Sequence, residues 1–327
     1  MLLHQERGYL SRIGVVEQAE SFRFLALSQA LQHLLRLVLA KGGFEHVASH
    51  PRTTRYRETA RQQLFLKLSD DLLADLPRHR LEVGDRRNDL LDLANRKGKA
   101  PGGYQSSLPE ARLPFIFMNS VGVQRDVETL LHEAGHAFHT MACQDEPLHS
   151  YRHAPIEFCE VASMAMELLG GEYLGEFYDT EEVRRARITH LEGIVFVFPW
   201  IATVDAFQHW LYLNPGHSVA ERDAAWDGLM DRFGGGIDWS GHERARAKLW
   251  HRQLHIFLHP FYYVEYGIAQ LGALQIWANS KQDRAQALAD YKIALALGGS
   301  RPLPELFERC NTRLDFSRET VSPMAEL

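Results

Sequence analysis

Two histidines and a glutamate in one short segment have the types and spacing that bind and use a divalent metal ion. Residues 127–143 read VETLLHEAGHAFHTMAC and contain His132, Glu133 and His136 in the pattern H-E-x-x-H. Apolar residues at helical spacing predict that this segment is a helix: Leu130, Ala134, Ala137 and Met141. On a helix, His132 and His136 lie about 40° apart and one turn above each other, so both imidazoles can reach one ion.

Such a pair of imidazoles suits Zn²⁺, and the carboxylate beside them suits general base catalysis. Neutral imidazoles are common zinc ligands, and a nearby carboxylate can take a proton from the water that attacks a carbonyl. The chain has 17 histidines, which raises the rate of accidental motifs. This motif falls on an independently predicted helix and follows a predicted strand. Both observations favour a metal site with Glu133 as the general base.

A zinc site that keeps one position for water needs a third protein ligand. The pattern H-E-x-x-H-x-x-G-x-x-H is excluded, because the third and sixth positions after His136 hold His139 and Ala142. His139 shares the face of the two motif histidines, but its Cα lies two helical turns from that of His132. We interpret His139 as a core histidine or as a support for a ligand, and we expect the third ligand elsewhere.

The next predicted helix, from about Ile156 to Leu169, carries candidate carboxylates. Glu160 is the preferred third ligand, because it lies 160 − 136 = 24 residues after His136, which leaves room for a connection and an antiparallel return. Glu157 is the reserve candidate. Two further polar side chains share the face of Glu160 and could support it: Ser163 and Glu167.

The elements that must position these residues are mainly helical. From Asp126 onward the chain predicts helices, with stops at Gly170-Gly171, Pro215-Gly216, Gly234-Gly235-Gly236 and Gly298-Gly299. The apolar run Leu113–Met118 predicts a strand beside the metal helix, and we expect it to form the sheet edge along which a peptide binds. Residues 97–104 contain a proline and two adjacent glycines and predict no regular structure.

The N-terminal part of the chain predicts a separate segment. Apolar residues at spacings of three and four predict a helix that begins near Phe24 and ends before Gly42, and a second helix is expected over residues 58–76. The composition shifts toward turn residues near Asp85. We therefore divide the chain into a short helical segment, residues 1–87, and a catalytic domain, residues 88–327.

Composition places the 327-residue chain among globular proteins, with 45% hydrophobic and 24% charged residues. Its net charge of −6 predicts no nucleic-acid or membrane partner. The three cysteines have no C-x-x-C spacing, which predicts neither a disulfide framework nor a cysteine zinc site, and Cys159 is expected to be a small core residue. Charges at the N-terminus interrupt any signal peptide, so a cytoplasmic location is expected. The longest apolar run, Gly193–Val204, is too short to cross a bilayer and predicts a buried core segment.

The sequence around the metal motif resembles the thimet oligopeptidase and oligoendopeptidase F family, most closely its bacterial oligoendopeptidase branch. The shared patterns are H-E-x-G-H-x-x-H, here residues 132–139, and E-x-x-S, here residues 160–163. The resemblance covers about residues 88–327. Its other segments are Asn95–Tyr104, Pro114–Asn119, His255–Phe257, Pro260–Tyr266, Gly298–Ser300 and Leu303–Phe307.

The resemblance implies a mostly helical, zincin-like catalytic domain with one Zn²⁺ held by His132, His136 and Glu160. It implies that Glu133 acts as general base and acid and that the substrates are short unstructured peptides. It also implies that downstream tyrosine hydroxyls donate to the oxyanion and that a histidine holds the substrate. The candidates for these roles are His255, Tyr263 and Tyr266. On the residues alone, we would assign the two tyrosines to core packing.

The N-terminal segment departs from the family. Family members carry a long helical domain that closes a channel over the site, and residues 1–87 are too few to form it. The segment is therefore expected to form a reduced lid, or a homo-oligomer or partner protein is expected to supply the missing wall. The alternative is a truncated, inactive homologue that binds peptide or metal, but the intact Glu133 favours an enzyme. A metal-dependent aminopeptidase is disfavoured, because Met118-Asn119 is a poor substitute for the Gly-x-Met-Glu-Asn segment of that class.

Overall fold

The computed structural model describes residues 90–100, 102–234 and 236–327, which belong to two compact units. The strand-bearing unit comprises residues 90–194 and Glu265–Leu314, and the tryptophan-rich unit comprises Val195–Val264 and Asp315–Leu327. The two helices predicted within residues 24–42 and 58–76 lie outside the described residues. The division of the chain at residues 87–88 stays a prediction.

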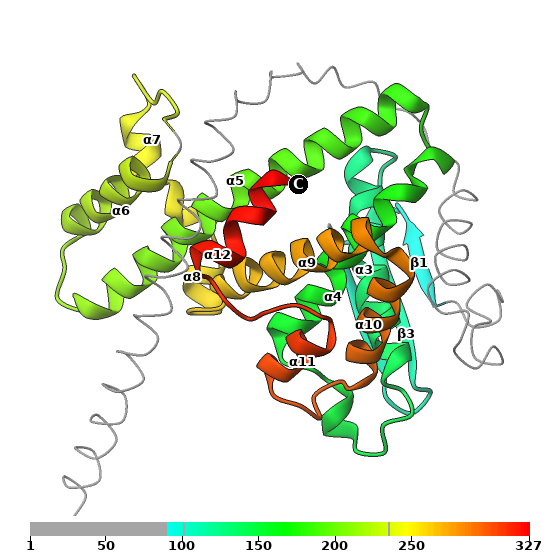
Figure 1. The fold of residues 1–327 in the computed structure, drawn as a ribbon. Coiled ribbons are helices and arrows are strands. Elements are labelled where there is room, and N and C mark those ends of the chain that lie inside the picture. Colours follow the sequence, from blue (N-terminus) through cyan, green and yellow to red (C-terminus); the bar gives the residue numbers. More distant parts are fainter. Residues whose placement is uncertain (1–89, 101, 235) are drawn as a thin grey trace, which may run out of the picture. The chain divides into compact units, whose positions relative to one another are not determined.

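The described part of the chain is mostly helical with a small sheet, which confirms the predicted fold class (Figure 1). The strands are β1 (Leu91–Ala94), β2 (Gly103–Leu108) and β3 (Leu113–Ser120). The α-helices are α3 (Gln124–Ala142), α4 (Ile156–Gly170), α5 (Thr180–Leu213), α6 (Val219–Phe233), α7 (Glu243–Ala247), α8 (His255–Leu258), α9 (Val264–Gln282), α10 (Arg284–Ala296), α11 (Leu303–Arg309) and α12 (Arg318–Val321). Short 3₁₀ helices are η3 (His149–Arg152), η4 (Gly171–Glu176), η5 (Leu249–Arg252) and η6 (Ser322–Glu326).

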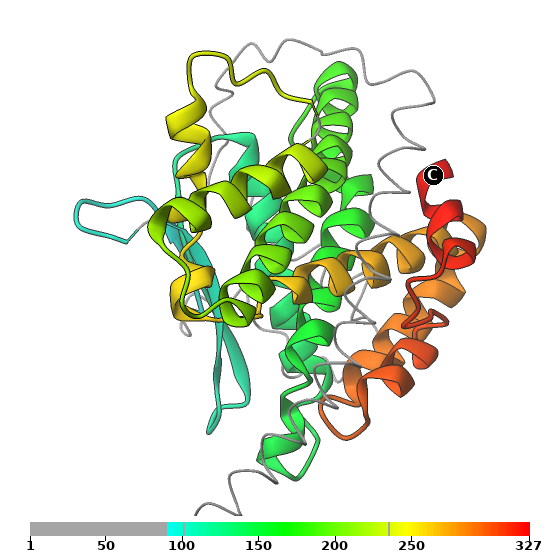
Figure 2. The ribbon, with the colours of Figure 1, turned by 90° about the vertical axis from the view of Figure 1, so that its left-hand side faces the viewer.

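The sheet supports the helix that carries the H-E-x-x-H motif. The strand predicted at residues 113–118 is confirmed as β3, which extends to Ser120. Alternate residues of β3 are buried, as the period of two in a strand requires: Pro114, Ile116, Met118 and Ser120. β2 and β3 form one antiparallel hairpin (Figure 2), and α3 contacts both strands.

The turn from β3 into α3 is fixed by one carboxylate. Asp126 Oδ2 accepts hydrogen bonds from the backbone N–H groups of Val121, Gly122 and Val123, at 2.9, 2.6 and 3.0 Å. Gly122 has a φ of 90°, a conformation that glycine adopts without steric cost. An acidic side chain in the first turn also interacts favourably with the positive end of the helix dipole. The start of the metal-motif helix is therefore set by its local sequence.

Two expectations about strands are wrong. Residues 97–104 were expected to hold no regular structure, but Gly103 and Tyr104 begin β2. Gly103 fits there because β2 approaches α3 closely: a Cβ at this position would lie 2.8 Å from Thr129 Cγ2. Leu113–Met118 is also not a sheet edge, because the strand order is β1-β3-β2 and β3 has a neighbour on each side. Apolar alternation identifies a strand but carries no information about its partners.

The predicted helix stops agree with the structure. α4 ends at Gly170, and α5 ends at Leu213, shortly before Pro215. α6 ends at Phe233 with Gly234 as its C-cap, and α10 ends at Ala296, two residues before Gly298. Gly298 has a φ of 50°, which favours glycine at the end of a helix.

The apolar run Gly193–Val204 lies inside α5 and is only partly buried, contrary to expectation. Phe198, Ile201 and Val204 are buried, whereas the side chain of Phe196 is 64% exposed. Apolar residues surround the helix here, so one contact face cannot cover them all. By length and composition, α5 could cross a membrane: its most apolar window of 18 residues has a mean hydropathy of 1.3 and is 56% buried. A core helix passes the same test, so this is weak evidence for a span.

Aromatic packing forms the core of the tryptophan-rich unit. The ring of Phe207 on α5 lies edge-on to Trp226 on α6, with centroids 5.1 Å apart, and 5.4 Å from Trp250. The buried Trp226 satisfies its indole N–H by donating to the Arg246 carbonyl at 3.1 Å. Ile256 belongs to the same core, and Tyr263 packs against it. This core therefore anchors the segment that carries His255 and Tyr263.

The glycine of the metal motif lies at a close crossing of two helices in the strand-bearing unit. A Cβ at Gly135 on α3 would lie 2.6 Å from both the carbonyl oxygen of Ala162 and the Cα of Ser163 on α4. Real Cβ atoms do not approach backbone so closely, so only glycine allows this crossing. The Ala162 carbonyl also accepts a hydrogen bond of 2.7 Å from the hydroxyl of Tyr291 on α10, which makes a sideways shift costly.

We expect Gly135→Ala to lower the free energy of unfolding by about 1–3 kcal/mol, because the added methyl group must separate two packed backbones. Gly193→Ala is the matched control, since Gly193 lies within α5 and a Cβ there meets nothing within 4 Å. The control should be neutral or stabilising by up to about 1 kcal/mol. Urea unfolding measures both values, and equal stabilities would contradict the assigned crossing.

Candidate metal centre

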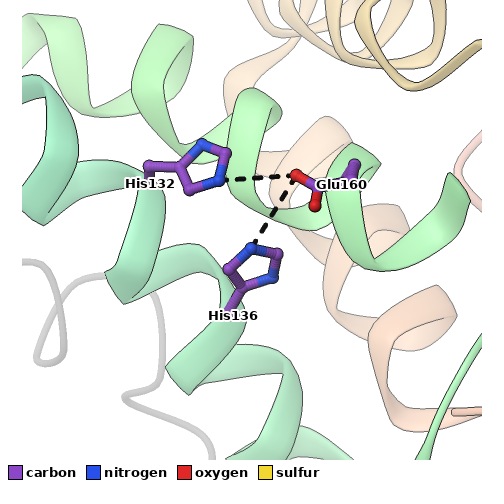
Figure 3. A group of neighbouring side chains, drawn as sticks. All are labelled: His132, His136 and Glu160. Atoms are coloured by element: carbon purple, nitrogen blue, oxygen red, sulfur yellow. Dashed lines mark ion pairs between the residues drawn. The ribbon is translucent and has the colours of Figure 1, made fainter. Parts of the chain in front are cut away.

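Three side chains from two helices converge in the strand-bearing unit (Figure 3). His132 and His136 lie on α3 and Glu160 lies on α4, and one ligand atom from each lies within 4.8 Å of the others. Glu160 Oε2 is 3.4 Å from His132 Nε2 and 3.8 Å from His136 Nε2. The two imidazole rings stand nearly perpendicular, at an interplanar angle of 84°. The structure thus groups Glu160, and not Glu157, with the two motif histidines.

The spacing of these atoms fits a zinc ion. Zinc binds imidazole nitrogen and carboxylate oxygen at about 2.0–2.2 Å in tetrahedral geometry, so neighbouring ligand atoms lie roughly 3.3–3.5 Å apart. The separations of 3.4 and 3.8 Å need only a small contraction. Two imidazoles and one carboxylate leave the fourth position for water or substrate, which is the arrangement of catalytic zinc sites.

Each of the three side chains is oriented by a second partner. His132 uses its Nδ1 to contact Glu167 Oε1 at 2.7 Å, which leaves Nε2 for the metal. His136 is hydrogen-bonded to the backbone of Cys159. The Ser163 hydroxyl donates to Glu160 Oε2 at 3.1 Å. Such contacts fix ring orientation and tautomer before an ion binds.

The pKa values show how strongly this centre holds positive charge. Burial opposes protonation of His132, but the hydrogen bonds that it donates to Glu160 and Glu167 outweigh this and raise its pKa to about 10. Burial lowers the pKa of His136 to about 4. Burial disfavours the Glu160 carboxylate, but the His132 contact outweighs this and lowers the pKa of Glu160. The two carboxylates thus favour a cation between them, a proton or a metal ion.

Glu133 has a different environment from the other two carboxylates. Its side chain is buried, and this desolvation raises its pKa to about 7. Its carboxylate accepts a hydrogen bond from the backbone N–H of Gln105 on β2. Glu133 and His132 line a cavity of about 490 Å³, together with Gly103, Met118 and Asn119 from the β2–β3 hairpin. A carboxylate that titrates near neutrality therefore faces a space beside the motif histidines.

The downstream candidates are divided between the two units. His255 and Tyr263 lie in the tryptophan-rich unit, where their ring centroids are 5.1 Å apart. Gln253 Nε2 lies 2.6 Å from His255 Nδ1, and its amide can only donate there, so the remaining proton of neutral His255 lies on Nε2. Tyr266 lies on α9, in the strand-bearing unit. The implied roles of these three residues at the metal stay predictions.

His139 is a core residue, as interpreted from the sequence, whereas Cys159, also expected in the core, is only partly buried. The His139 ring is 4% exposed and packs edge-on against Phe158, with centroids 6.0 Å apart. Its Nε2 has no hydrogen-bond partner among the described residues. The Cys159 thiol is largely enclosed, and burial raises its pKa to about 12, so it resists the deprotonation that metal binding requires.

Sequence reasoning missed two contacts of this centre. His190 on α5 contacts the second oxygen of Glu167, with Nε2 to Oε2 at 2.9 Å. No motif surrounds His190 in the sequence, so only its place in the fold reveals it. The backbone bond from Gln105 to Glu133 was also missed, because a side-chain pattern carries no signal for a main-chain donor.

Comparison with known proteins gives one consistent family. The sequence profile of peptidase family M3 matches residues 78–326. An oligoendopeptidase F homolog of Borreliella burgdorferi is 26% identical over 234 residues, which cover 67% of this chain and 39% of that protein. Oligopeptidase PepF of Bacillus subtilis is 35% identical over 107 residues, or 32% of this chain and 16% of that protein.

The solved structure of PZ peptidase A with an inhibitor is also similar to this chain. The two structures have a TM-score of 0.78 at 27% identity, over 92% of this chain and 57% of that one. The chain therefore spans less than two thirds of the length of each of these three relatives.

We expect His139→Leu to make the protein less sensitive to acid. Burial lowers the pKa of His139 to about 3, whereas an unfolded histidine titrates near 6.5, so the unfolded chain binds more protons below about pH 6.5. The wild type should lose about 1.4 kcal/mol of stability per pH unit below that value through this one group.

Urea unfolding of His139→Leu and the wild type at pH 8 and pH 5, with metal content held equal, measures this difference. From pH 8 to pH 5, the free energy of unfolding of the wild type should fall by about 2 kcal/mol more than that of the variant. If the difference in free energy of unfolding between the variant and the wild type does not change with pH, the buried neutral state of His139 is contradicted.

Proposed function

The chain belongs to peptidase family M3, and from this premise we propose that it is a zinc-dependent endopeptidase that hydrolyses short unstructured oligopeptides. The observation that carries the proposal is the convergence of His132, His136 and Glu160 within 4.8 Å. Glu133 follows His132 directly on α3, and its side chain is buried. Its carboxylate is not needed to hold the ion. The donor set, the open fourth position and this carboxylate together support hydrolysis by activated water.

The residues of the chain supply the proton transfers. When bound, zinc supplies a Lewis acid that polarises the scissile carbonyl. Glu133 accepts a proton from the attacking water as the water oxygen bonds to the carbonyl carbon. The C–N bond then breaks, and Glu133 returns the proton to the leaving nitrogen. A pKa near 7 suits both steps, because such a group can take and give a proton near neutral pH.

We propose that the peptide binds as an extended strand along β2, which replaces β3 in this role. In the sheet formed by the described residues, β2 is an edge strand, and it contacts the metal-motif helix. The Gln105 N–H points away from β3 toward Glu133, which brings this edge to the proposed base. An added strand needs a substrate whose backbone groups are free to pair. This requirement favours short unstructured peptides over folded proteins.

We further propose that Tyr263 and Tyr266 donate to the oxyanion and that His255 holds the substrate. The Nε2–H tautomer of His255 supports a donor role for this residue. Tyr263 is hydrogen-bonded to Trp200, whose indole also donates to Gln253 at 3.0 Å. This network holds His255 and Tyr263 in a defined mutual arrangement.

One set of variants tests the zinc ligands and the general base separately. His132→Ala and Glu160→Ala should lose zinc, because two ligands cannot close the site, whereas Glu133→Gln should keep it. The Glu133→Gln variant should nevertheless lose at least about 10²-fold in activity, because an amide cannot accept the water proton. Elemental analysis of zinc and hydrolysis of a quenched fluorescent oligopeptide, with and without chelator, measure the two properties.

Stoichiometric zinc in His132→Ala or Glu160→Ala would contradict the ligand set. Full hydrolysis after chelation, or by Glu133→Gln, would contradict the mechanism. A wild-type chain that holds zinc but hydrolyses no peptide would instead favour the inactive homologue that binds peptide or metal.

Removing a hydroxyl from Tyr263 or Tyr266 should lower kcat much more than it raises KM. A donor aimed at the oxyanion acts mainly in the transition state, and its loss costs about 10²-fold or more in kcat for the more important tyrosine. Steady-state kinetics of Tyr263→Phe and Tyr266→Phe on the same peptide, with Tyr212→Phe as the exposed control, measures the effect. If both variants keep the wild-type kcat, the two tyrosines have a packing role and do not donate to the oxyanion.

A further inference from the structure

A second histidine binds the far side of the carboxylate that orients His132. Glu167 on α4 contacts His132 Nδ1 through Oε1 at 2.7 Å and His190 Nε2 through Oε2 at 2.9 Å. The three residues come from α3, α4 and α5, and their side chains are between 16% and 25% exposed. Both oxygens of one carboxylate are therefore held by imidazoles from different helices.

The charges of His132, Glu167 and His190 agree with the geometry of these contacts. Burial disfavours the Glu167 carboxylate, but its hydrogen bonds to His132 and His190 outweigh this and lower its pKa to about 2. Burial also opposes protonation of His190, but the Glu167 contact outweighs it and raises the His190 pKa. Two charged groups of α3 face His190 with opposite effects, Glu128 and Arg125. With an imidazole nitrogen at 2.7 Å from Oε1 and another at 2.9 Å from Oε2, Glu167 lies between two potential donors.

The two ends of Glu167 face different cavities. Glu167 and His132 line the cavity beside the proposed base. Glu167 and His190 line a second cavity of about 190 Å³, together with Arg187, Leu191 and Trp277. His190 is not among the residues that line the first cavity. A change at His190 therefore removes no side chain from the wall of the first cavity and can reach the metal centre through Glu167.

We propose that His190 is a positioning residue of the metal centre and acts through Glu167. By holding Oε2, His190 fixes the Glu167 carboxylate so that Oε1 accepts the Nδ1 proton of His132, which leaves the Nε2 lone pair aimed at the ion. Partners that orient a metal-ligating histidine in this way typically contribute 10–100-fold to metal affinity. The inference rests on the proposed function, since it assumes that His132 binds zinc.

The test compares zinc affinity in variants that differ in what they offer to Glu167. His190→Leu removes the donor and should weaken zinc binding about tenfold or more. His190→Gln keeps an amide donor of similar reach and should stay within about threefold of the wild type. Arg187→Leu is the matched control: Arg187 lines the same cavity from the same helix but donates to the Gly171 carbonyl at 3.0 Å, and its loss should leave affinity unchanged.

Competition with a chromogenic chelator on the full chain gives the affinities, and the visible spectrum of the cobalt-substituted protein reports ligand geometry. The cobalt spectrum should change in His190→Leu and stay like the wild type in His190→Gln. If His190→Leu fails to fold, His190→Asn replaces it, because its shorter amide does not reach Glu167 and should weaken binding in the same way. If His190 acted through packing alone, His190→Leu would keep more of the wild-type zinc affinity than His190→Gln.

A double-mutant cycle separates action through Glu167 from a direct effect. Glu167→Gln should weaken zinc binding by about 10–100-fold, and adding His190→Leu should weaken it no further. Additive effects, or wild-type affinity in His190→Leu, would overturn this inference and leave the proposed function intact. A wild-type chain that binds no zinc would overturn both.

Discussion

The close crossing of α3 and α4 at Gly135 is the constraint on which the metal centre depends. Gly135 lies one residue before His136, and the backbone that it meets follows Glu160 by two and three residues. The contact that brings the two helices together therefore also brings the two histidines to the carboxylate. Any side chain at this position would push α4 away and separate Glu160 from the imidazoles. The glycine in H-E-A-G-H is thus a packing requirement of the site.

A second constraint is the cost of burying charge. Glu133, Glu160 and Glu167 lie near one another in a largely enclosed region, where three uncompensated carboxylates would be strongly disfavoured. The centre resolves this by pairing. Glu160 and Glu167 share His132 and keep low pKa values, and Glu167 gains His190 as a further partner. For Glu133 the cost of burial outweighs the attraction of His132, and its pKa rises. One small region thereby contains carboxylates suited to holding a cation and one suited to moving a proton.

The sheet supports the helix of the metal centre, and the tryptophan-rich unit has an aromatic core of its own. The β2–β3 hairpin backs the metal-motif helix and offers the edge along which a peptide strand could lie. The aromatic core of the tryptophan-rich unit holds the segment with His255 and Tyr263. The chemistry proposed for them follows from residue types that the chain itself places within each unit.

The sequence by itself determined the features that depend on local geometry. Four residues make about one helical turn, so the pair His132 and His136 could be assigned to one ion without a structure. The same rule separated His139 from the pair, and the number of residues between His136 and Glu160, which leaves room for an antiparallel return, selected Glu160. Helix stops followed from glycine and proline, and β3 from its apolar alternation. Family resemblance then added His255, Tyr263 and Tyr266 as predicted site residues, which local geometry could not do.

Only the tertiary structure decided which distant elements meet. It made β3 a central strand and β2 an edge, because strand order depends on pairing across the chain and not on the composition of one strand. It placed the Gln105 N–H on Glu133 and His190 on Glu167, contacts between residues that are 28 and 23 positions apart in the chain. Helical and strand periodicity act over a few residues, whereas these contacts depend on how whole helices pack. The ligand pair could therefore be derived from the sequence, but the partners that orient it could not.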